Sequence, residues 1–257
     1  MRALRITLIV LVVLGGLFVA VDRIAVNYAE GKAADKVRES EGLDKNPDVS
    51  IKGFPFLTQA AGGTLDEVEV RMDDYRARTE TPAGSQDGQD STREGADSVL
   101  IERLDAKLHD VEFSGDYSSA TAKRADGTAT ISYAELLKAA QVEPMELAPG
   151  VTAKVTGLSD GGNGRIKVEV KATVLGRALP DPVYVMSSAR VDDDIVKVHA
   201  DALPKIPVKV AEDKVREITD FQQRISGLPA GIHLDRVEAA EDGVEVSVTG
   251  AGVKLGS

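Results

Sequence analysis

The chain has 257 residues, no cysteine and a formal net charge of −11 at pH 7, because 42 acidic residues outnumber 31 Lys and Arg. This balance argues against a nucleic-acid-binding protein, which needs a basic face, and against docking on anionic lipid through a polybasic patch. Without cysteine the chain can form neither a disulfide nor a lipoprotein-type attachment. Its fold must therefore depend on burial of apolar side chains, for which the length is sufficient.

The N-terminus carries an apolar run of 16 residues, from Ile6 to Val21, which follows Arg2 and Arg5. A helix of this run measures about 24 Å, which is shorter than the roughly 30 Å hydrocarbon core of a bilayer. Residues 1–21 are therefore predicted to form a signal peptide or a short signal-anchor. The two arginines predict a cytoplasmic N-terminus and an extracytoplasmic location for the rest of the chain.

Two observations favour an anchor that is retained. Cleavage is expected near Ala20, but Phe18 occupies a position that requires a small residue. The segment 22–42 continues the helix without a break up to Gly42, with one face formed by Ile24, Tyr28, Ala34 and Val37. We therefore expect a single-pass anchor in the cell membrane, and a cleaved protein that is secreted or periplasmic is the alternative.

Most of the remaining chain alternates apolar and polar residues, which is typical of strands with one covered and one wet face in an antiparallel sheet. The clearest alternation lies in residues 67–72, 166–174 and 244–249. Weaker strands are predicted at 48–52, 100–113, 127–131, 151–157, 182–188, 195–201 and 232–239. The turn residues at 159–164 and 240–243 predict two hairpins.

Two helices and one insertion interrupt the strands. Ser132 and Glu135 form a capping-box pattern that predicts a short helix after the strand at 127–131. A second helix is predicted over 211–226, from a stripe formed by Val215, Ile218, Phe221 and Ile225. Residues 79–97 contain no large apolar side chain, which predicts a mobile insertion.

These elements together predict the fold class. They indicate an α+β fold in which a long antiparallel sheet carries amphipathic helices on its apolar face. The sequence shows no shift in composition after the anchor, so residues 22–257 are predicted to form a single extracytoplasmic domain.

No pattern in the sequence supports catalysis. Residues 157–161 match the Gly-x-Ser-x-Gly nucleophile elbow, but a strand rather than a helix follows, so Ser159 is predicted to lie at a hairpin turn. His109, His199 and His233 are isolated from other metal ligands. The acidic run 192–194 lacks the spacing of a calcium loop. We expect neither an enzyme nor a site for a metal or cofactor.

Three segments resemble the LmeA-like phospholipid-binding family of actinobacterial cell envelopes. The first is Gly-Phe-Pro-Phe-Leu-Thr at 53–58, followed by Gly63 and an alternating strand. The second is the segment ISYAELLKAA at 131–140, and the third is 225–250, where Leu-Pro leads into the closing hairpin. The likeness covers nearly all of the predicted extracytoplasmic part, and the insertion at 79–97 has no counterpart in it.

The resemblance implies a fold similar to one half of the bactericidal permeability-increasing type. In such a fold a long curved sheet wraps around one or more amphipathic helices, and an apolar tunnel lies between the sheet and the helices. It also implies a membrane-anchored phospholipid-binding protein that supports envelope lipid or lipoglycan assembly. A phosphoinositide-type phospholipid is the implied ligand, and the cell membrane and an envelope glycosyltransferase are the implied partners. The alternatives are a non-catalytic envelope scaffold without a lipid ligand and an unrecognised accessory of an envelope hydrolase or transferase.

Apolar side chains that share one period and oppose charged faces are predicted to line the tunnel. The predicted lipid-binding residues are Phe54, Phe56, Leu57, Val68, Val70, Ile166, Val168, Val170, Ile218, Phe221 and Ile225. Pro55 biases Phe54 towards an extended backbone, which predicts that Phe54 and Phe56 project to the same side. Either both rings plug the end of the tunnel, or both wedge into the bilayer at its mouth, or both are ordinary core residues at the end of the sheet.

Overall fold

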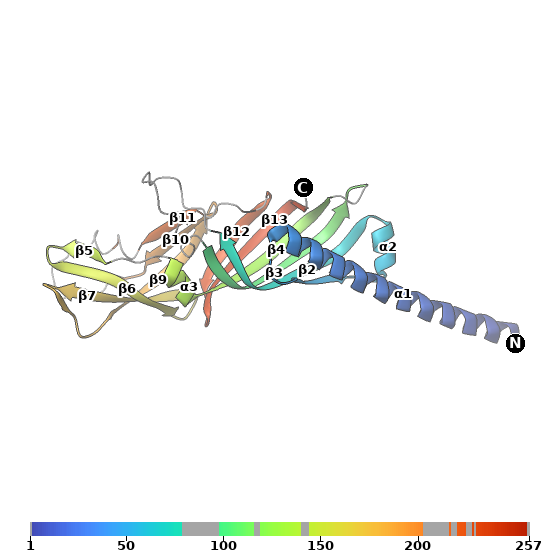
Figure 1. The fold of residues 1–257 in the computed structure, drawn as a ribbon, viewed down its shortest axis with the longest axis horizontal. Coiled ribbons are helices and arrows are strands. Elements are labelled where there is room, and N and C mark those ends of the chain that lie inside the picture. The colour runs from blue at the N-terminus through green and yellow to red at the C-terminus, as the bar shows by residue number, and fades with distance from the viewer. Residues whose placement is uncertain are drawn as a thin grey trace.

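The computed structural model describes most of the chain as one long N-terminal helix and two antiparallel sheets (Figure 1). The described residues are 2–78, 98–115, 119–139, 144–202, 216, 220–224, 228 and 230–255. The expected insertion at 79–97 lies outside them. The two sheets follow one another along the long axis of the molecule, and the helix extends from one end (Figure 1).

Helix α1 (Arg2–Glu41) joins the apolar run to the domain without a break. Its first half projects away from the sheets, and its second half lies beside them (Figure 1). The helix ends at the predicted position, where Gly42 has a φ of +64° and the Leu43 N–H donates to the Arg38 carbonyl at 2.9 Å. Glycine adopts this left-handed conformation at no steric cost. The helix predicted over 22–42 is confirmed, but its predicted apolar face is wrong, because Ala34 is buried whereas Ile24 and Tyr28 are exposed on another side of the helix.

The first sheet has six strands in the order β1-β2-β3-β4-β13-β12, and all neighbours are antiparallel. The strands are β1 (Asp48–Lys52), β2 (Thr64–Arg78), β3 (Ser98–Phe113), β4 (Ala120–Ser132), β12 (Ile232–Ala239) and β13 (Gly243–Leu255). The short helix α2 (Phe56–Ala61) connects β1 to β2. Both ends of the domain sequence thus contribute to one sheet.

The second sheet has the order β11-β10-β9-β7-β6-β5, and a short strand β8 also pairs with β7. Its strands are β5 (Met145–Ala148), β6 (Val151–Asp160), β7 (Arg165–Val174), β8 (Arg177–Ala178), β9 (Val183–Asp192), β10 (Ile195–Ala200) and β11 (Phe221–Arg224). Helix α3 (Tyr133–Ala139) begins directly after β4, and the chain then enters the second sheet.

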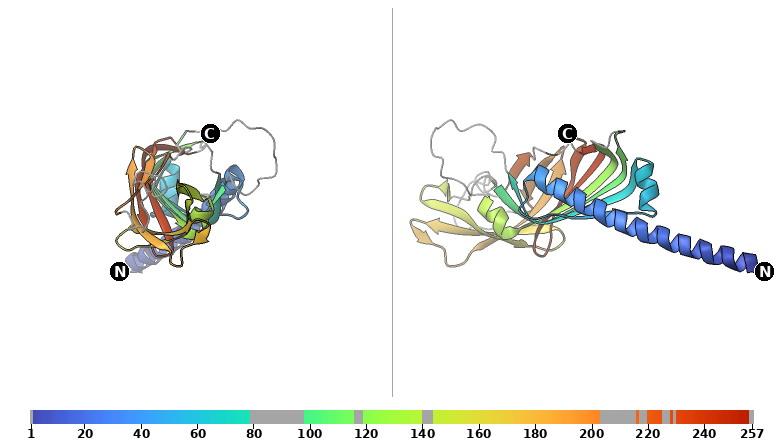
Figure 2. Two further views of the ribbon diagram at one scale, coloured as in Figure 1. Left: turned by 90° about the vertical axis from the view of Figure 1, so that its left-hand side faces the viewer. Right: turned by 45° about the vertical axis from the view of Figure 1, so that its right-hand side comes forward.

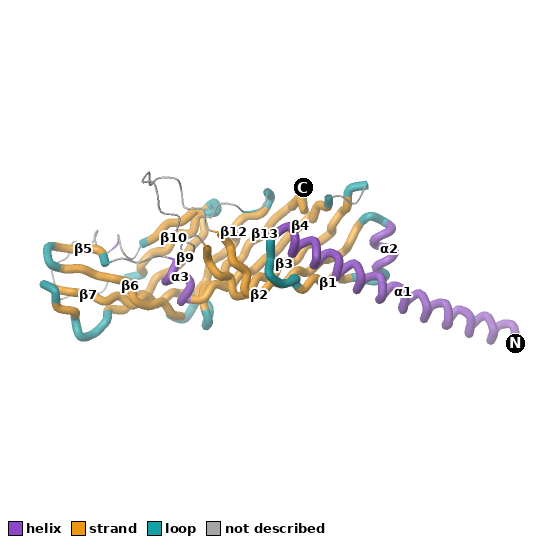
Figure 3. The backbone as a smooth tube through the Cα atoms, in the orientation of Figure 1, coloured by secondary structure: helices purple, strands orange, loops and turns teal. Residues whose placement is uncertain are grey.

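Strands make up most of the described part of the domain, and the labelled helices are α1, α2 and α3 (Figure 3). Viewed nearly end-on, the strands curl around a common interior (Figure 2). This arrangement confirms the expected α+β fold with a curved antiparallel sheet. The strands are divided between two sheets: α3 lies between β4 of the first sheet and β5 of the second, and the chain returns to the first sheet at β12.

Two apolar cores lie in this interior, towards its opposite ends. The helix-side core contains Val26, Ile51, Phe56, Leu65, Val111, Ala122, Ala125 and Val253. The far core contains Leu147, Val151, Ala153, Ile166, Val168, Val170, Val185, Ala200, Val237 and Val244. Since each buried methylene stabilises the fold by about 0.8 kcal/mol, these cores take the place of the disulfides that the chain lacks.

The hairpins at 159–164 and 240–243 and the start of α3 are confirmed. Asp160 accepts the Gly162 N–H at 2.7 Å in the first turn, and the Ala240 N–H donates to Gly243 at 2.8 Å in the second. The Ser132 hydroxyl accepts the Glu135 N–H at 3.4 Å, as a capping residue does.

The helix predicted over 211–226 is wrong at its C-terminal end, although Arg216, which the structure also describes, is helical. Residues 221–224 form strand β11, which pairs with residues 195–198 of β10 in antiparallel register. The open edge of β10 supplies hydrogen-bond partners for an extended chain, and this tertiary pairing overrides the helical period of the sequence. Ile218 and Ile225 lie outside the described residues.

Candidate functional site

Pairing in the first sheet aligns apolar residues in continuous rows across the strands. One row runs Val70–Ala106–Gly127–Val248–Leu234, and the next runs Met72–Leu104–Ala129–Val246–Val237. Directly opposed residues point to the same side of a sheet. The six strands therefore present one continuous apolar face, which we call the inner face.

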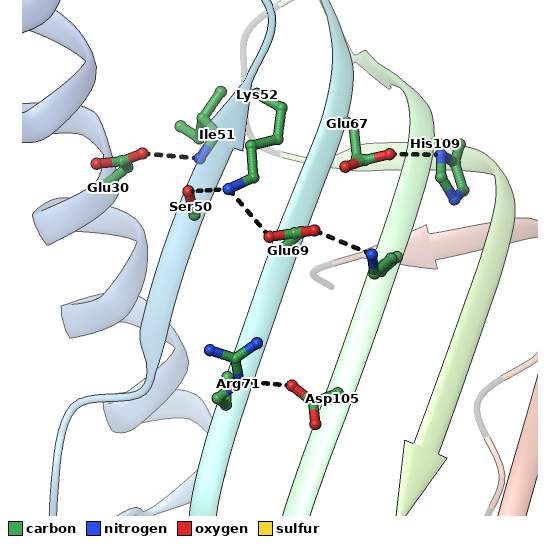
Figure 4. Close-up of polar contacts among 10 residues, drawn as sticks. Glu30, Ser50, Ile51, Lys52, Glu67, Glu69, Arg71, Asp105 and His109 are labelled. Carbon is green, nitrogen blue, oxygen red and sulfur yellow. Dashed lines mark hydrogen bonds and ion pairs between the residues drawn. The ribbon is translucent and has the colours of Figure 1, made fainter.

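The opposite face of the same sheet is charged. Glu69 lies 3.0 Å from the Lys52 ammonium and 3.1 Å from that of Lys107, and Arg71 donates to Asp105 at 2.6 Å (Figure 4). Hydrogen bonds from the two lysines hold the pKa of Glu69 below its usual value, with Lys52 as the larger cause. A face carrying such ion pairs stays in water, so the inner face is the candidate surface for an apolar ligand.

The middle of the inner face belongs to neither core. Six apolar residues here are only partly buried, whereas the cores on either side contain fully buried side chains. We call these six the central strip: Val70, Met72, Leu104, Ala106, Ala129 and Val248. A strip of partly exposed apolar side chains between two closed cores is a surface suited to an apolar ligand.

The predicted wall residues separate into two groups. Val68 and Val70 lie on the inner face of the first sheet, where Val68 also packs against the helix-side core. Ile166, Val168 and Val170 lie on β7 of the second sheet and are buried in the far core. Phe221 belongs to β11, at the edge of the second sheet. The predicted residues are thus not neighbours in one continuous row.

Sequence reasoning missed most of the central strip. The strand at 100–113 was predicted only weakly, and its inner residues Leu104 and Ala106 were not assigned to a face. Ala129 and Gly127 are small, so their place on an apolar surface carries no hydrophobic signal of its own. Only the cross-strand register, which the sequence alone does not reveal, places them beside Met72 and Val248.

The two rings of the Phe-Pro-Phe segment lie in different environments. Phe56 is 8% exposed and belongs to the helix-side core, against which Leu57 also packs. Phe54 is 57% exposed, and the Arg23 guanidinium lies 5.4 Å from its ring centroid. The expectation that both rings project to one side is wrong, because α2 begins at Phe56 and ends the strand-like alternation.

Buried polar contacts hold α1 against this segment. Asp22 is completely buried, and its carboxylate accepts the Leu57 N–H at 2.9 Å and an Arg23 N–H at 2.8 Å. Glu30 of α1 accepts the Ile51 N–H of β1 at 2.8 Å (Figure 4). These bonds position the helix where the apolar run ends and the helix-side core begins.

Gly53 makes the bend before α2 possible. Its φ is +94°, and a Cβ atom at this position would lie 2.5 Å from Gln59 Nε2 and 2.6 Å from Asp66 Oδ2. Gln59 Oε1 in turn accepts the Asp66 N–H at 2.8 Å. Any side chain at position 53 would therefore displace the contact that joins α2 to β2.

The serine and the histidines considered for catalysis and metal binding lie on strands. Ser159 lies at the end of β6, directly before the hairpin turn. His199 Nδ1 lies 2.6 Å from Asp220 Oδ2, and His233 Nδ1 lies 3.2 Å from Asp194 Oδ2. In the part of the chain that the structure describes, no three His, Asp or Glu side chains gather as metal ligands would.

Comparison with known proteins gives one family. The sequence model of the family described as LmeA-like phospholipid-binding matches residues 20–249. No significant match was found among curated proteins or among solved structures.

Proposed function

Because the chain belongs to the LmeA-like phospholipid-binding family, we propose that it is a membrane-anchored phospholipid-binding protein whose ligand lies with its acyl chains along the central strip. Val70, Met72, Leu104, Ala106, Ala129 and Val248 form the surface that the acyl chains contact. The observation that carries this proposal is the partial exposure of an apolar strip between two closed cores.

The energetics of lipid extraction support an apolar strip as the site. Each methylene that leaves water gains about 0.8 kcal/mol, so a 16-carbon chain needs roughly 12 kcal/mol of apolar contact to leave a bilayer without loss. Flexible acyl chains fit against Val, Met, Leu and Ala side chains, so the site needs no aromatic residue. The −11 charge of the chain is consistent with recognition through apolar contact rather than through a basic patch.

Helix α1 supplies the membrane anchor in this proposal. It is long and apolar enough to cross a bilayer, and its apolar run is exposed along its length. The run continues into the docked half of α1 without a break, and Asp22 is bonded to the domain at the junction. With Arg2 and Arg5 on the cytoplasmic side, the sheets lie outside the cell membrane.

The finer role that we propose is support of envelope lipid or lipoglycan assembly. A phosphoinositide-type phospholipid is the proposed ligand, and an envelope glycosyltransferase is the proposed partner. The family match supports the phospholipid class, and the resemblance of segments 53–58, 131–140 and 225–250 supports the assembly role.

The test uses two adjacent residues of β4 that face opposite sides of the sheet. Ala129 lies in the central strip, whereas Thr128 is exposed on the charged face, where it pairs with Asp105. The full chain is reconstituted in liposomes that contain a phospholipid with a photoactivatable diazirine in its acyl chain. After illumination, crosslinked peptides from β3, β4 and β13 are quantified by mass spectrometry.

We expect Ala129→Trp to lower crosslinking to these peptides about tenfold, because a ring that displaces about two methylenes, each worth about 0.8 kcal/mol, removes roughly 1.6 kcal/mol of acyl contact. Thr128→Trp should crosslink as the parent does. Equal crosslinking in both variants would exclude the central strip as the site. If the parent protein is crosslinked only at α1, lipid binding by the domain is refuted, and the alternative of an envelope scaffold without a lipid ligand is favoured.

A further inference from the structure

Helix α1 exposes an apolar stripe that continues past the apolar run. Ile24 and Tyr28 are 70% and 68% exposed, although both lie in the half of α1 that packs on the domain. Leu17, Val21, Ile24 and Tyr28 are spaced four, three and four residues apart, which places them on one face of the helix. We call these four residues the outer stripe.

The outer stripe faces away from the domain. Asp22, Val26 and Ala34 are buried on the opposite side of α1, where Val26 belongs to the helix-side core. The stripe ends at a cation, because the Lys32 ammonium lies 5.8 Å from the centroid of the Tyr28 ring. A tyrosine followed by a lysine is typical of the level at which a helix leaves the hydrocarbon and meets the lipid head groups.

A second exposed ring lies close to the same level. Phe54 precedes α2, and the Arg23 guanidinium that lies 5.4 Å from its ring belongs to the first turn of α1 after the apolar run. Two separate segments thus present an aromatic ring next to a cation where α1 leaves the apolar run. Exposed rings of this size in water are unfavourable unless another apolar phase covers them.

We propose that the outer stripe and Phe54 form an interfacial contact with the lipid bilayer, which seats the helix-side core of the domain at the level of the head groups. The proposal rests on the proposed membrane anchoring by α1. The bilayer is the occupant that the geometry favours, because the stripe is continuous with the apolar run and carries no charged residue before Lys32.

Helix length supports this assignment. The apolar run alone measures about 24 Å, which is short of the roughly 30 Å hydrocarbon core. Measured from Ile6 to Tyr28, the outer face of the same helix is 23 residues or about 34 Å long. On the domain side the apolar surface ends at Asp22. A helix whose two sides leave the hydrocarbon at different heights is tilted, so that its outer side is immersed as far as Tyr28 while the bilayer surface on the domain side lies at Asp22, beside Arg23 and the ring of Phe54.

The absence of cysteine makes a direct depth measurement simple. Single cysteines are introduced into the full chain as Ile24→Cys, Tyr28→Cys and Phe54→Cys, and each is spin-labelled in phosphatidylcholine nanodiscs. Collision with oxygen, which concentrates in lipid, is compared with collision with a water-soluble nickel complex. Val12→Cys gives the value for the membrane interior, and Leu175→Cys and Lys36→Cys give the aqueous value at exposed sites.

We expect the labels at positions 24, 28 and 54 to favour oxygen, with depths between those of Val12→Cys and the aqueous controls. Depths equal to the aqueous controls would overturn the proposal, and so would labels shielded from both reagents, which would indicate a protein partner on the stripe. Aqueous depths at 24, 28 and 54 combined with normal crosslinking of the central strip would refute this contact alone. If the spin labels at positions 24, 28 and 54 are exposed to lipid but the parent protein shows no crosslinking at the central strip, the proposed function is refuted and the bilayer contact stands.

Discussion

The carboxylate of Asp22 accepts a hydrogen bond from the backbone N–H of Leu57 at 2.9 Å, although the two residues lie 35 positions apart in the sequence. This bond joins the end of the apolar run to the first turn of α2. Asp22 is completely buried, and Arg23 donates to its second oxygen at 2.8 Å. A carboxylate in such a place is tolerated only because both of its oxygens have donors.

Removing this carboxylate should loosen the contact between anchor and domain. Asp22→Ala leaves the Leu57 N–H without its acceptor, so we expect faster hydrogen exchange at the amide of Leu57 and a melting temperature lowered by several degrees. Asp22→Asn keeps an acceptor oxygen and should retain more of the protection. Hydrogen exchange with mass spectrometry on the full chain measures both variants. Parent-like protection at Leu57 in Asp22→Ala would show that the bond does not hold α2 to α1.

Core and ligand surface should respond differently to a large side chain. Val168 is buried in the far core, so Val168→Trp should lower the free energy of unfolding by about 1–3 kcal/mol through overpacking. Ala106 lies in the partly exposed central strip, so Ala106→Trp should cost less than about 1 kcal/mol while it weakens lipid crosslinking. Denaturant titration and crosslinking of both proteins provide the comparison. Equal destabilisation by the two variants would mean that the strip is closed core.

Much of the fold follows from local patterns in the sequence. The period of α1, the alternation of β2, β7 and β13 and the turn residues at 159–164 and 240–243 each depend on neighbours in the sequence, and each was predicted correctly. The division of the strands into two sheets depends instead on where the chain returns to the first sheet after β11. No local pattern records that return.

The candidate site shows the same limit. Val68 and Val70 carry a strong alternating signal and were assigned to an apolar face, which the register confirms. Ala106 and Ala129 complete that face, but small residues give no hydrophobic pattern. Asp22 looks like an ordinary charged residue after an apolar run, because its partner Leu57 is brought to it only by the folded chain.

The hydroxyl of Tyr133 provides a prediction for alkaline pH. It donates to the Ala240 carbonyl at 2.7 Å, and burial raises its pKa to about 12 from an ordinary value of 10. The neutral form is therefore favoured by folding. The buried, neutral Tyr133 hydroxyl therefore contributes fully to the free energy of unfolding below pH 10, and this contribution is lost as the pH rises towards about 12.

Absorbance titration of the phenolates tests this raised pKa. Tyr133→Phe should remove a phase of the titration that is centred near pH 12 in the folded protein. The difference in unfolding free energy between parent and Tyr133→Phe should shrink as the pH approaches 12. A removed phase centred near pH 10 would contradict the raised pKa.

The two rings of the Phe-Pro-Phe segment should be separable by mutation. Phe56 lies in the helix-side core, so Phe56→Ser should lower the free energy of unfolding by about 3–5 kcal/mol. Phe54 is exposed beside Arg23, so Phe54→Ser should cost less than about 1 kcal/mol. Chemical unfolding of the two single variants measures this difference directly.

Lipid transfer between vesicles, measured on the same preparations, then separates a role at the membrane from a role in packing. If Phe54 contacts the bilayer where α1 leaves it, Phe54→Ser should slow transfer while the protein melts near the parent. Tyr184→Ser removes another exposed ring, far from α1 on β9, and should transfer normally. A Phe54→Ser protein with parent-like stability and parent-like transfer would show that the exposed ring has no part in lipid exchange. Strong destabilisation by Phe54→Ser would show instead that the ring supports the bend at Gly53, because only a packed ring would cost several kcal/mol to remove.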